Sequence, residues 1–193
     1  MELGHRVVLC DMFFGLEDYP GTLEGIFENP PALGGTRIDE TAPDLEAVRA
    51  SRKLKSESMF GDRVLELCAM ADIVFMALHG RCGEDGKVQA AFDLLGIKYT
   101  GSGHLGSAIA MDKDLTKRVV APLGVLTPEW KLYDARTLDP EAVCAEAALP
   151  CVVKPVDSGS SIGVDIAHTR EELLRALDSA RAEGGAVVVE RYI

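Results

Sequence analysis

The chain has 193 residues, 47% of them hydrophobic and 26% charged, and a formal net charge of −11. This composition is typical of a globular protein with one large or two small domains. The acidic balance argues against nucleic acid as a partner, and no apolar run reaches the roughly 18 residues that a membrane-spanning helix needs. Five cysteines without a CxxC pair, and a start without a signal-peptide pattern, predict a cytoplasmic protein.

The first predicted strand spans residues 6–10, RVVLC. Periodicity then fades over residues 11–60, where prolines and glycines interrupt the pattern. Between Asp11 and Glu46 there are nine acidic residues and one basic residue, which predicts a solvated excursion rather than core. The sequence allows a short helix near residues 43–52, but it gives this segment no chemical role.

A strand–helix–strand unit is predicted between residues 61 and 100. Asp62 is expected to cap a helix, residues 72–78 form a continuous apolar strand, and a helix with Val88 and Phe92 inward leads to a strand at 97–100. Such a unit predicts an open parallel α/β sheet, in which ligands bind beyond the carboxyl ends of the strands. His79 follows the strand at 72–78, so it is either a structural histidine satisfied by backbone groups or a functional one.

Residues 101–106, GSGHLG, match the G-x-G-x-x-G pattern of dinucleotide-binding folds. The acidic residue expected about 20 positions later is missing, because the chain reads APLGV at residues 121–125. An NAD-dependent oxidoreductase is therefore a weak alternative. The glycines are instead expected to allow close approach at a helix N-terminus.

A single helix is predicted from residue 103 to residue 121. It carries Lys113 between two aspartates, an arrangement usually found on a solvated surface. Lys117 is also placed on the solvated face, so Lys117→Ala is expected to be nearly silent. A domain boundary is predicted after residue 123, giving domains at 1–123 and 124–193.

The remaining chain alternates strands and helices around one polar stretch. Strands are expected at 127–133, 151–154, 162–166 and 186–193, and helices are expected after Asp139 and after a capping box at residues 169–172. The strand at 151–154 delivers Lys154, and the small residues at 157–161 can fold their N–H groups and hydroxyls around an anion. The simpler alternative is a β-hairpin with a flexible tip.

Six short motifs resemble those of the D-alanine–D-alanine ligases, members of the ATP-grasp superfamily, and they occur in the same order. They are HGRCGEDG at 79–86, YTGSG at 99–103, MDK at 111–113, VKP at 153–155, GSSIG at 159–163 and ERYI at 190–193. The resemblance covers residues 71–193, and residues 6–10 resemble the second strand of the family's N-terminal domain. It implies a Rossmann-like parallel-sheet domain at 1–123, followed at 124–193 by the first half of an ATP-grasp domain with an antiparallel sheet.

The resemblance also implies roles for individual residues. His79 and Ser160 would be catalytic and would contact the first D-alanine. The residues implied to bind ATP are Lys113, Lys154, Ser160, Ser161, Glu190, Arg191 and Ile193. The family joins two D-alanines through an acyl phosphate, with ATP and Mg²⁺ or Mn²⁺, for peptidoglycan synthesis and hence cell shape. No metal ligand is expected within this chain.

Compared with the family pattern, the chain is expected to be a fragment that lacks the first strand and stops at the adenine hinge. The resemblance leaves open a D-alanine–D-lactate or D-alanine–D-serine ligase, and also a non-catalytic nucleotide-binding fragment. The implied partners are ATP and D-alanine, without nucleic acid or membrane, and the full-length protein is expected to form a homodimer.

If the chain is such a fragment, the 193-residue polypeptide alone will bind ATP weakly and turn over no D-alanine. A phosphate-release assay with ATP and D-alanine checks this expectation. Release above the protein-free background would contradict it.

Overall fold

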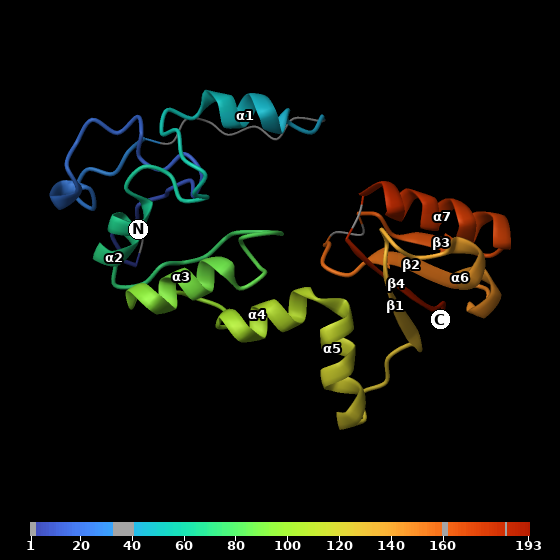
Figure 1. Cartoon of the computed structure of the whole chain (residues 1–193). Helices are drawn as coiled ribbons and strands as arrows, with labels where there is room; N and C mark the ends of the chain where they lie inside the picture. The colour runs from blue at the N-terminus through green and yellow to red at the C-terminus, as the bar shows by residue number, and fades with distance from the viewer. Residues whose placement is uncertain (1–2, 33–40, 160–161, 184) are drawn as a thin grey trace. The chain divides into compact units, whose positions relative to one another are not determined.

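The computed structural model describes residues 3–32, 41–159, 162–183 and 185–193 (Figure 1). The chain forms two compact units, one from Met1–Val74 with Leu95–Lys98 and the other from Phe75–Leu94 with Tyr99–Ile193. No helix in the described ranges is both long and apolar enough to cross a bilayer. The predicted division after residue 123 stays a prediction.

The first unit holds the short helices η1 (Leu23–Gly25), α1 (Leu45–Ser51) and α2 (Val64–Met70). Its small core contains Leu16, Ile26 and Leu67. The Asp44 carboxylate caps α1, as N-cap chemistry favours. Asp62 does not cap α2 as predicted, because its carboxylate instead forms an ion pair with Arg63, which is the N-cap residue.

The parallel strands expected in the first half of the chain are not formed. Within the described ranges, strands occur only from Trp130 onward, so the segments 6–10, 72–78 and 97–100 are not strands. The Val74 N–H still donates to the Lys98 carbonyl at 2.8 Å. The apolar run is not covered on both faces, since Ile73 is 58% exposed and Phe75 is 80% exposed. A parallel strand needs such cover, so apolar composition alone did not produce a ladder here.

Three α-helices precede the sheet in the second unit. They are α3 (Lys87–Leu95), α4 (His104–Met111) and α5 (Lys113–Val120), and η2 (Ala121–Leu123) follows them. Leu95, the last residue of α3, belongs to the first unit. The prediction of one helix from 103 to 121 was wrong, because the helix is interrupted at Asp112, between α4 and α5. The backbone of Asp112 is extended, with φ −87° and ψ 111°, and its carboxylate accepts a hydrogen bond from the Leu115 N–H at 2.9 Å. Asp112 therefore starts a new helix as its N-cap.

A four-stranded antiparallel sheet forms the rest of the second unit, as predicted. Its strands are β1 (Trp130–Asp134), β2 (Cys151–Pro155), β3 (Asp165–Ala167) and β4 (Ala186–Arg191), in the order β1-β4-β2-β3. Helices α6 (Pro140–Glu146) and α7 (Arg170–Glu183) complete it (Figure 1). The predicted capping box holds, since Thr169 and Glu172 exchange hydrogen bonds of 3.2 Å.

The two faces of this sheet have different roles. One face packs against α6 and α7 in a core that includes Val153, Leu177 and Val189. Side chains alternate along a strand, so Lys154 and Glu190 lie on the opposite face. The sheet therefore separates an apolar core from a polar surface.

Leu177 on α7 is fully buried in that core. Leu177→Ala is expected to lower the free energy of unfolding by about 2–5 kcal/mol, because it removes buried methyl groups and leaves a cavity. Urea unfolding followed by circular dichroism measures this loss. The control is Leu126→Ala, since Leu126 is 99% exposed and should change stability by less than about 0.5 kcal/mol. Equal effects of the two substitutions would contradict this assignment of the core.

Candidate functional site

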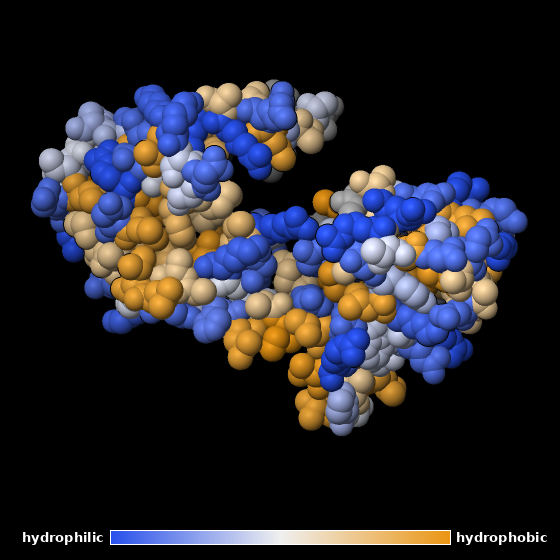
Figure 2. Space-filling model, in the orientation of Figure 1, coloured by the Kyte–Doolittle hydropathy of each residue, from blue (hydrophilic) through white to orange (hydrophobic). Residues whose placement is uncertain are grey.

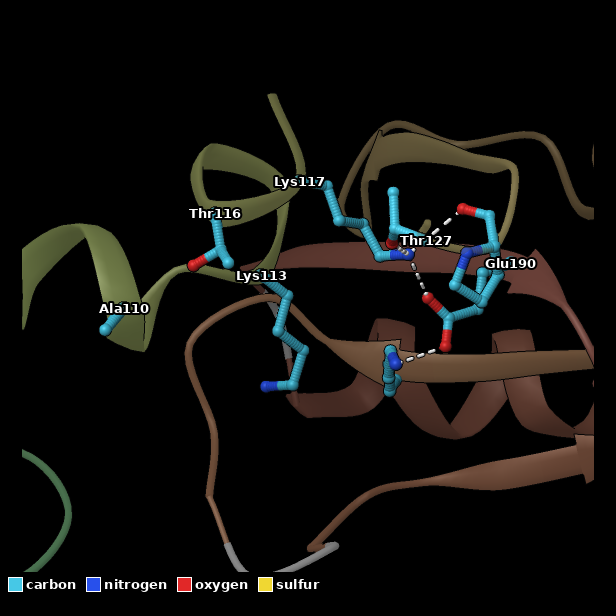
Figure 3. Close-up of a pocket in the computed structure, with 8 residues that line it drawn as sticks. Ala110, Lys113, Thr116, Lys117, Thr127 and Glu190 are labelled. Atoms are coloured by element: carbon cyan, nitrogen blue, oxygen red, sulfur yellow. Dashed lines mark hydrogen bonds and ion pairs between the residues drawn. The ribbon is translucent and has the colours of Figure 1, made fainter. Parts of the chain in front are cut away.

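A pocket of about 300 Å³ lies between α5 and the polar face of the sheet (Figure 3). Every residue that lines it belongs to the second unit. The lining residues are Ala110, Lys113, Thr116, Lys117, Thr127, Pro128, Lys154 and Glu190. Three lysines and one glutamate give the pocket a net positive charge, which favours an anionic ligand.

Local structure explains how the charged side chains reach this pocket. Lys113 and Lys117 are four residues apart on α5, so they project from the same side of the helix. On the sheet, Val152 of β2 pairs with Glu190 of β4, which makes Lys154 a diagonal neighbour of Glu190 on the same face. The break at Asp112 and the strand register together bring these side chains to one place.

The Glu190 carboxylate lies between two lysine ammonium groups. One oxygen forms an ion pair with Lys154 Nζ, and the other lies 2.8 Å from Lys117 Nζ. Glu190 is only 8% exposed. Burial alone would raise the pKa of this carboxyl, but the hydrogen bonds and charges of Lys117 and Lys154 outweigh burial and lower its pKa. The carboxylate is thus held in its charged form.

Lys117 is buried, which corrects the prediction that it lies on the solvated face. Only 7% of the residue is exposed, and its Nζ donates to Thr127 Oγ1 at 2.8 Å and to the Pro128 carbonyl at 3.1 Å. The prediction failed because α5 turns its charged side toward the sheet. Its apolar residues Leu115 and Val119 are 45% and 48% exposed, and Figure 2 shows apolar surface over α4 and α5.

A second buried carboxylate fixes α5 to the start of β1. Asp114 accepts a hydrogen bond from Trp130 Nε1 at 2.7 Å and forms an ion pair with Arg118 Nε at 2.6 Å. The hydrogen bond from Arg118 lowers the pKa of the Asp114 carboxyl. Burial acts in the opposite direction, and the hydrogen bond from Trp130 lowers the pKa further. Lys117 Nζ in turn lies 5.1 Å from the centre of the Trp130 ring.

Lys113 joins α5 to the chain that follows β2. Its N–H donates to the Val156 carbonyl at 2.9 Å, and its Nζ donates to the Ser158 carbonyl. Burial first, and then the nearby charge of Lys154, lowers the pKa of the Lys113 ammonium. Lys113 and Lys154 both line this pocket.

His79 is exposed and is not one of the residues that line the pocket. It opens the glycine-rich loop 79–86, which is joined to the segment after β2 by an ion pair of 3.1 Å between Arg81 and Asp157. The loop therefore lies beside the chain that leads into the predicted anion-binding turn. Ser160 and Ser161, also predicted in the site, lie outside the described residues.

The predicted adenine hinge, residues 190–193, is at the end of β4. The Arg191 N–H donates to the Glu129 carbonyl at 2.9 Å, and the Tyr192 N–H donates to the Pro150 carbonyl at 3.2 Å. These two donors are already used, while the Arg191 and Ile193 side chains are exposed. Across the described ranges, no group of three or more His, Cys, Asp or Glu side chains could hold a metal ion.

Sequence reasoning missed Lys117, Thr127 and the side-chain role of Glu190. Lys117 could have been found from its spacing of four residues from Lys113, which puts both on one helix face. Thr127 gave no signal, because its contact depends on how the chain turns after η2. Glu190 was predicted only as part of the adenine hinge, so the ion pairs of its side chain, at the end of a buried strand, were not predicted.

Comparisons with known proteins identify the family that the chain resembles. The family model described as D-ala D-ala ligase N-terminus matches residues 26–102, and the one described as D-ala D-ala ligase C-terminus matches residues 119–193. A D-alanine–D-alanine ligase of Lacticaseibacillus casei is 36% identical over 189 residues, which are 98% of this chain and 52% of that protein. The chain thus spans about half the length of the curated relatives it matches.

Solved structures show the same similarity. The D-alanine–D-alanine ligase of Bacillus anthracis complexed with ATP matches with a TM-score of 0.60 and 34% identity, over 68% of this chain and 44% of that one. The D-Ala:D-Ser ligase VanG of Enterococcus faecalis matches with a TM-score of 0.57 and 36% identity, over 64% of this chain and 36% of that one.

The state of Glu190 predicts a dependence of stability on pH. Its pKa in the folded chain lies below the ordinary value of 4.5, so the ion pairs contribute fully above pH 4.5 and are lost as the pH falls through the folded pKa. The free energy of unfolding of the wild type, relative to Glu190→Gln, should therefore decrease as the pH falls below 4.5. Urea titrations of both proteins at neutral and acidic pH measure this difference. A difference that stays constant, or grows in acid, would contradict the assigned ion pairs.

Proposed function

Because the chain belongs to the D-alanine–D-alanine ligase family, we propose that its pocket binds the phosphates of ATP during the ligation of two D-alanines. The product would be D-alanyl-D-alanine, a precursor of peptidoglycan. The observation that carries the proposal is that Lys113 of α5 and Lys154 of β2 line one pocket of net positive charge. The similarity to an ATP-complexed ligase supports ATP as the anionic ligand.

The proposed reaction has two steps. An oxygen of the first D-alanine carboxylate attacks the γ-phosphorus of ATP, the bond to ADP breaks, and an acyl phosphate forms. The amine of the second D-alanine then attacks the acyl carbon, loses a proton, and inorganic phosphate leaves. Phosphoryl transfer depends mainly on positioning and on neutralising the charge that spreads over the phosphate oxygens.

Individual residues receive roles within this proposal. Lys113 and Lys154 would contact the phosphates, as charge-assisted donors. His79 and Ser160 would lie at the first D-alanine, and Ser161 at a phosphate. The backbone of the hinge, at Glu190, Arg191 and Ile193, would contact the edge of the adenine. The ion pair between Arg81 and Asp157 supports this grouping, because it joins the loop that carries His79 to the segment before Ser160.

The proposal extends to the setting of the reaction. We place residues 124–193 in the small subdomain of an ATP-grasp domain, which the antiparallel sheet supports. Mg²⁺ or Mn²⁺ would accompany the triphosphate, with ligands outside the described residues. The five free cysteines support a reducing compartment, the cytoplasm. A homodimer is proposed for the full-length protein.

Substitution of the pocket lysines tests the proposal. Lys154→Ala and Lys113→Ala should each weaken ATP binding by roughly 1.5–3 kcal/mol, because each removes a charge-assisted phosphate contact. Isothermal titration of the chain with ATP measures the loss. Lys131→Ala is the matched control, because Lys131 carries the same charge but is exposed, pairs with Glu146 of α6 and does not line the pocket.

Unchanged ATP affinity in both pocket variants would refute the placement of the phosphates. For the full-length protein, product analysis with D-alanine alone, with added D-serine and with added D-lactate tests the second substrate. We expect D-alanyl-D-alanine as the main product. Preferential formation of the D-serine product would instead favour the activity named for VanG.

A further inference from the structure

Lys117 has more partners than either of the other two lysines of the pocket. An ammonium group has three N–H donors. Lys117 Nζ donates to Thr127 Oγ1 at 2.8 Å and to the Pro128 carbonyl at 3.1 Å, and it forms an ion pair with Glu190 Oε2 at 2.8 Å. Figure 3 shows its side chain pointing toward Glu190 and Thr127. Contact with a ligand would therefore compete with the buried partners that Lys117 already has.

Lys154 is less constrained. Its side chain is 19% exposed, against 9% for Lys117, and it forms an ion pair with Glu190 Oε1. If Lys154 turned to a phosphate and Glu190 had no other partner, the glutamate would remain as an unpaired buried charge, which is strongly unfavourable. With Lys117 in place, the carboxylate keeps one cation when Lys154 leaves.

We propose that Lys117 is a positioning residue of the pocket: it serves as the permanent counter-ion of Glu190 and so allows Lys154 to exchange Glu190 for a phosphate of the ligand. Lys117 itself does not contact the nucleotide. Its location supports this role, because the neighbouring Asp114–Trp130 hydrogen bond holds α5 against the start of β1. The inference rests on the proposed function, namely that the pocket binds ATP.

The test compares Lys117→Met with Lys131→Met, the same substitution at an exposed lysine outside the pocket. Without Lys117, Glu190 has only Lys154 and should retain it. Titration of the chain should show ATP binding weakened about tenfold, within the range of coupling in one ion-pair network. Adenosine, which lacks phosphates, should bind as it does to the wild type. Lys131→Met should change neither affinity.

A second substitution distinguishes this role from simple structural support. In Lys117→Met/Glu190→Gln the competing carboxylate is gone, so Lys154 is free and ATP affinity should recover most of the loss. A residue needed only for folding would not be rescued by removing another ion-pair partner. Unchanged ATP binding in Lys117→Met, no recovery in the double variant, or an equal loss of adenosine binding would each overturn the inference.

Circular dichroism establishes that each variant is folded. If Lys117→Met is not, Lys117→Gln replaces it, because the amide keeps a donor for Thr127 while the charge is removed, and the same affinities are expected. Failure of the wild-type chain to bind ATP at all would refute the proposed function, and this inference with it. Binding of ATP by the wild type and by the Lys117 variant with equal affinity would refute the inference alone.

Discussion

The Glu190 carboxylate, buried between two lysine side chains, is the interaction on which the pocket depends. It joins three elements that are distant in sequence: Lys117 from α5, Lys154 from β2 and its own strand, β4. A buried ion pair gains stability only if its geometry and remaining hydrogen bonds are good. Here each carboxylate oxygen forms an ion pair with one lysine, and Lys117 also donates hydrogen bonds to Thr127 and to the Pro128 carbonyl. The cluster fixes the side of α5 that faces the sheet.

This requirement explains the inverted character of α5. A helix next to a sheet usually directs its apolar residues inward. In α5 the inward residues are Lys113, Asp114 and Lys117, while Leu115 and Val119 are exposed. The packing between α5 and the sheet is therefore largely electrostatic, and it leaves a polar pocket where an apolar helix face would have filled the space. The fold and the proposed binding of an anion thus have the same physical origin.

Much of the second unit could be predicted from sequence, because its signals are local. The capping box at Thr169, the cap at Asp139 and the β-branched strands at β2 and β4 each fix an element through neighbouring residues. The convergence of Lys113 and Lys154 was predicted from the motif resemblance and not from periodicity.

Where the outcome depended on distant contacts, local reasoning failed. The run at 72–78 is apolar enough for a buried strand but lacks cover, and Lys117 is buried only because Glu190 and Thr127 are brought to it. The break at Asp112 was readable as an N-cap, but the apolar pattern on both sides of it suggested one continuous helix.

The central claim is that Lys113 and Lys154 meet the phosphates of one nucleotide while Lys117 stays within its buried ion pair. Acetylation of lysine side chains, followed residue by residue with mass spectrometry in the presence and absence of ATP, tests it most directly. The account predicts that ATP slows labelling of Lys113 and Lys154, leaves exposed Lys131 unchanged, and finds Lys117 poorly labelled in both conditions. Unchanged labelling of Lys113 and Lys154 at ATP concentrations that saturate the chain would contradict it.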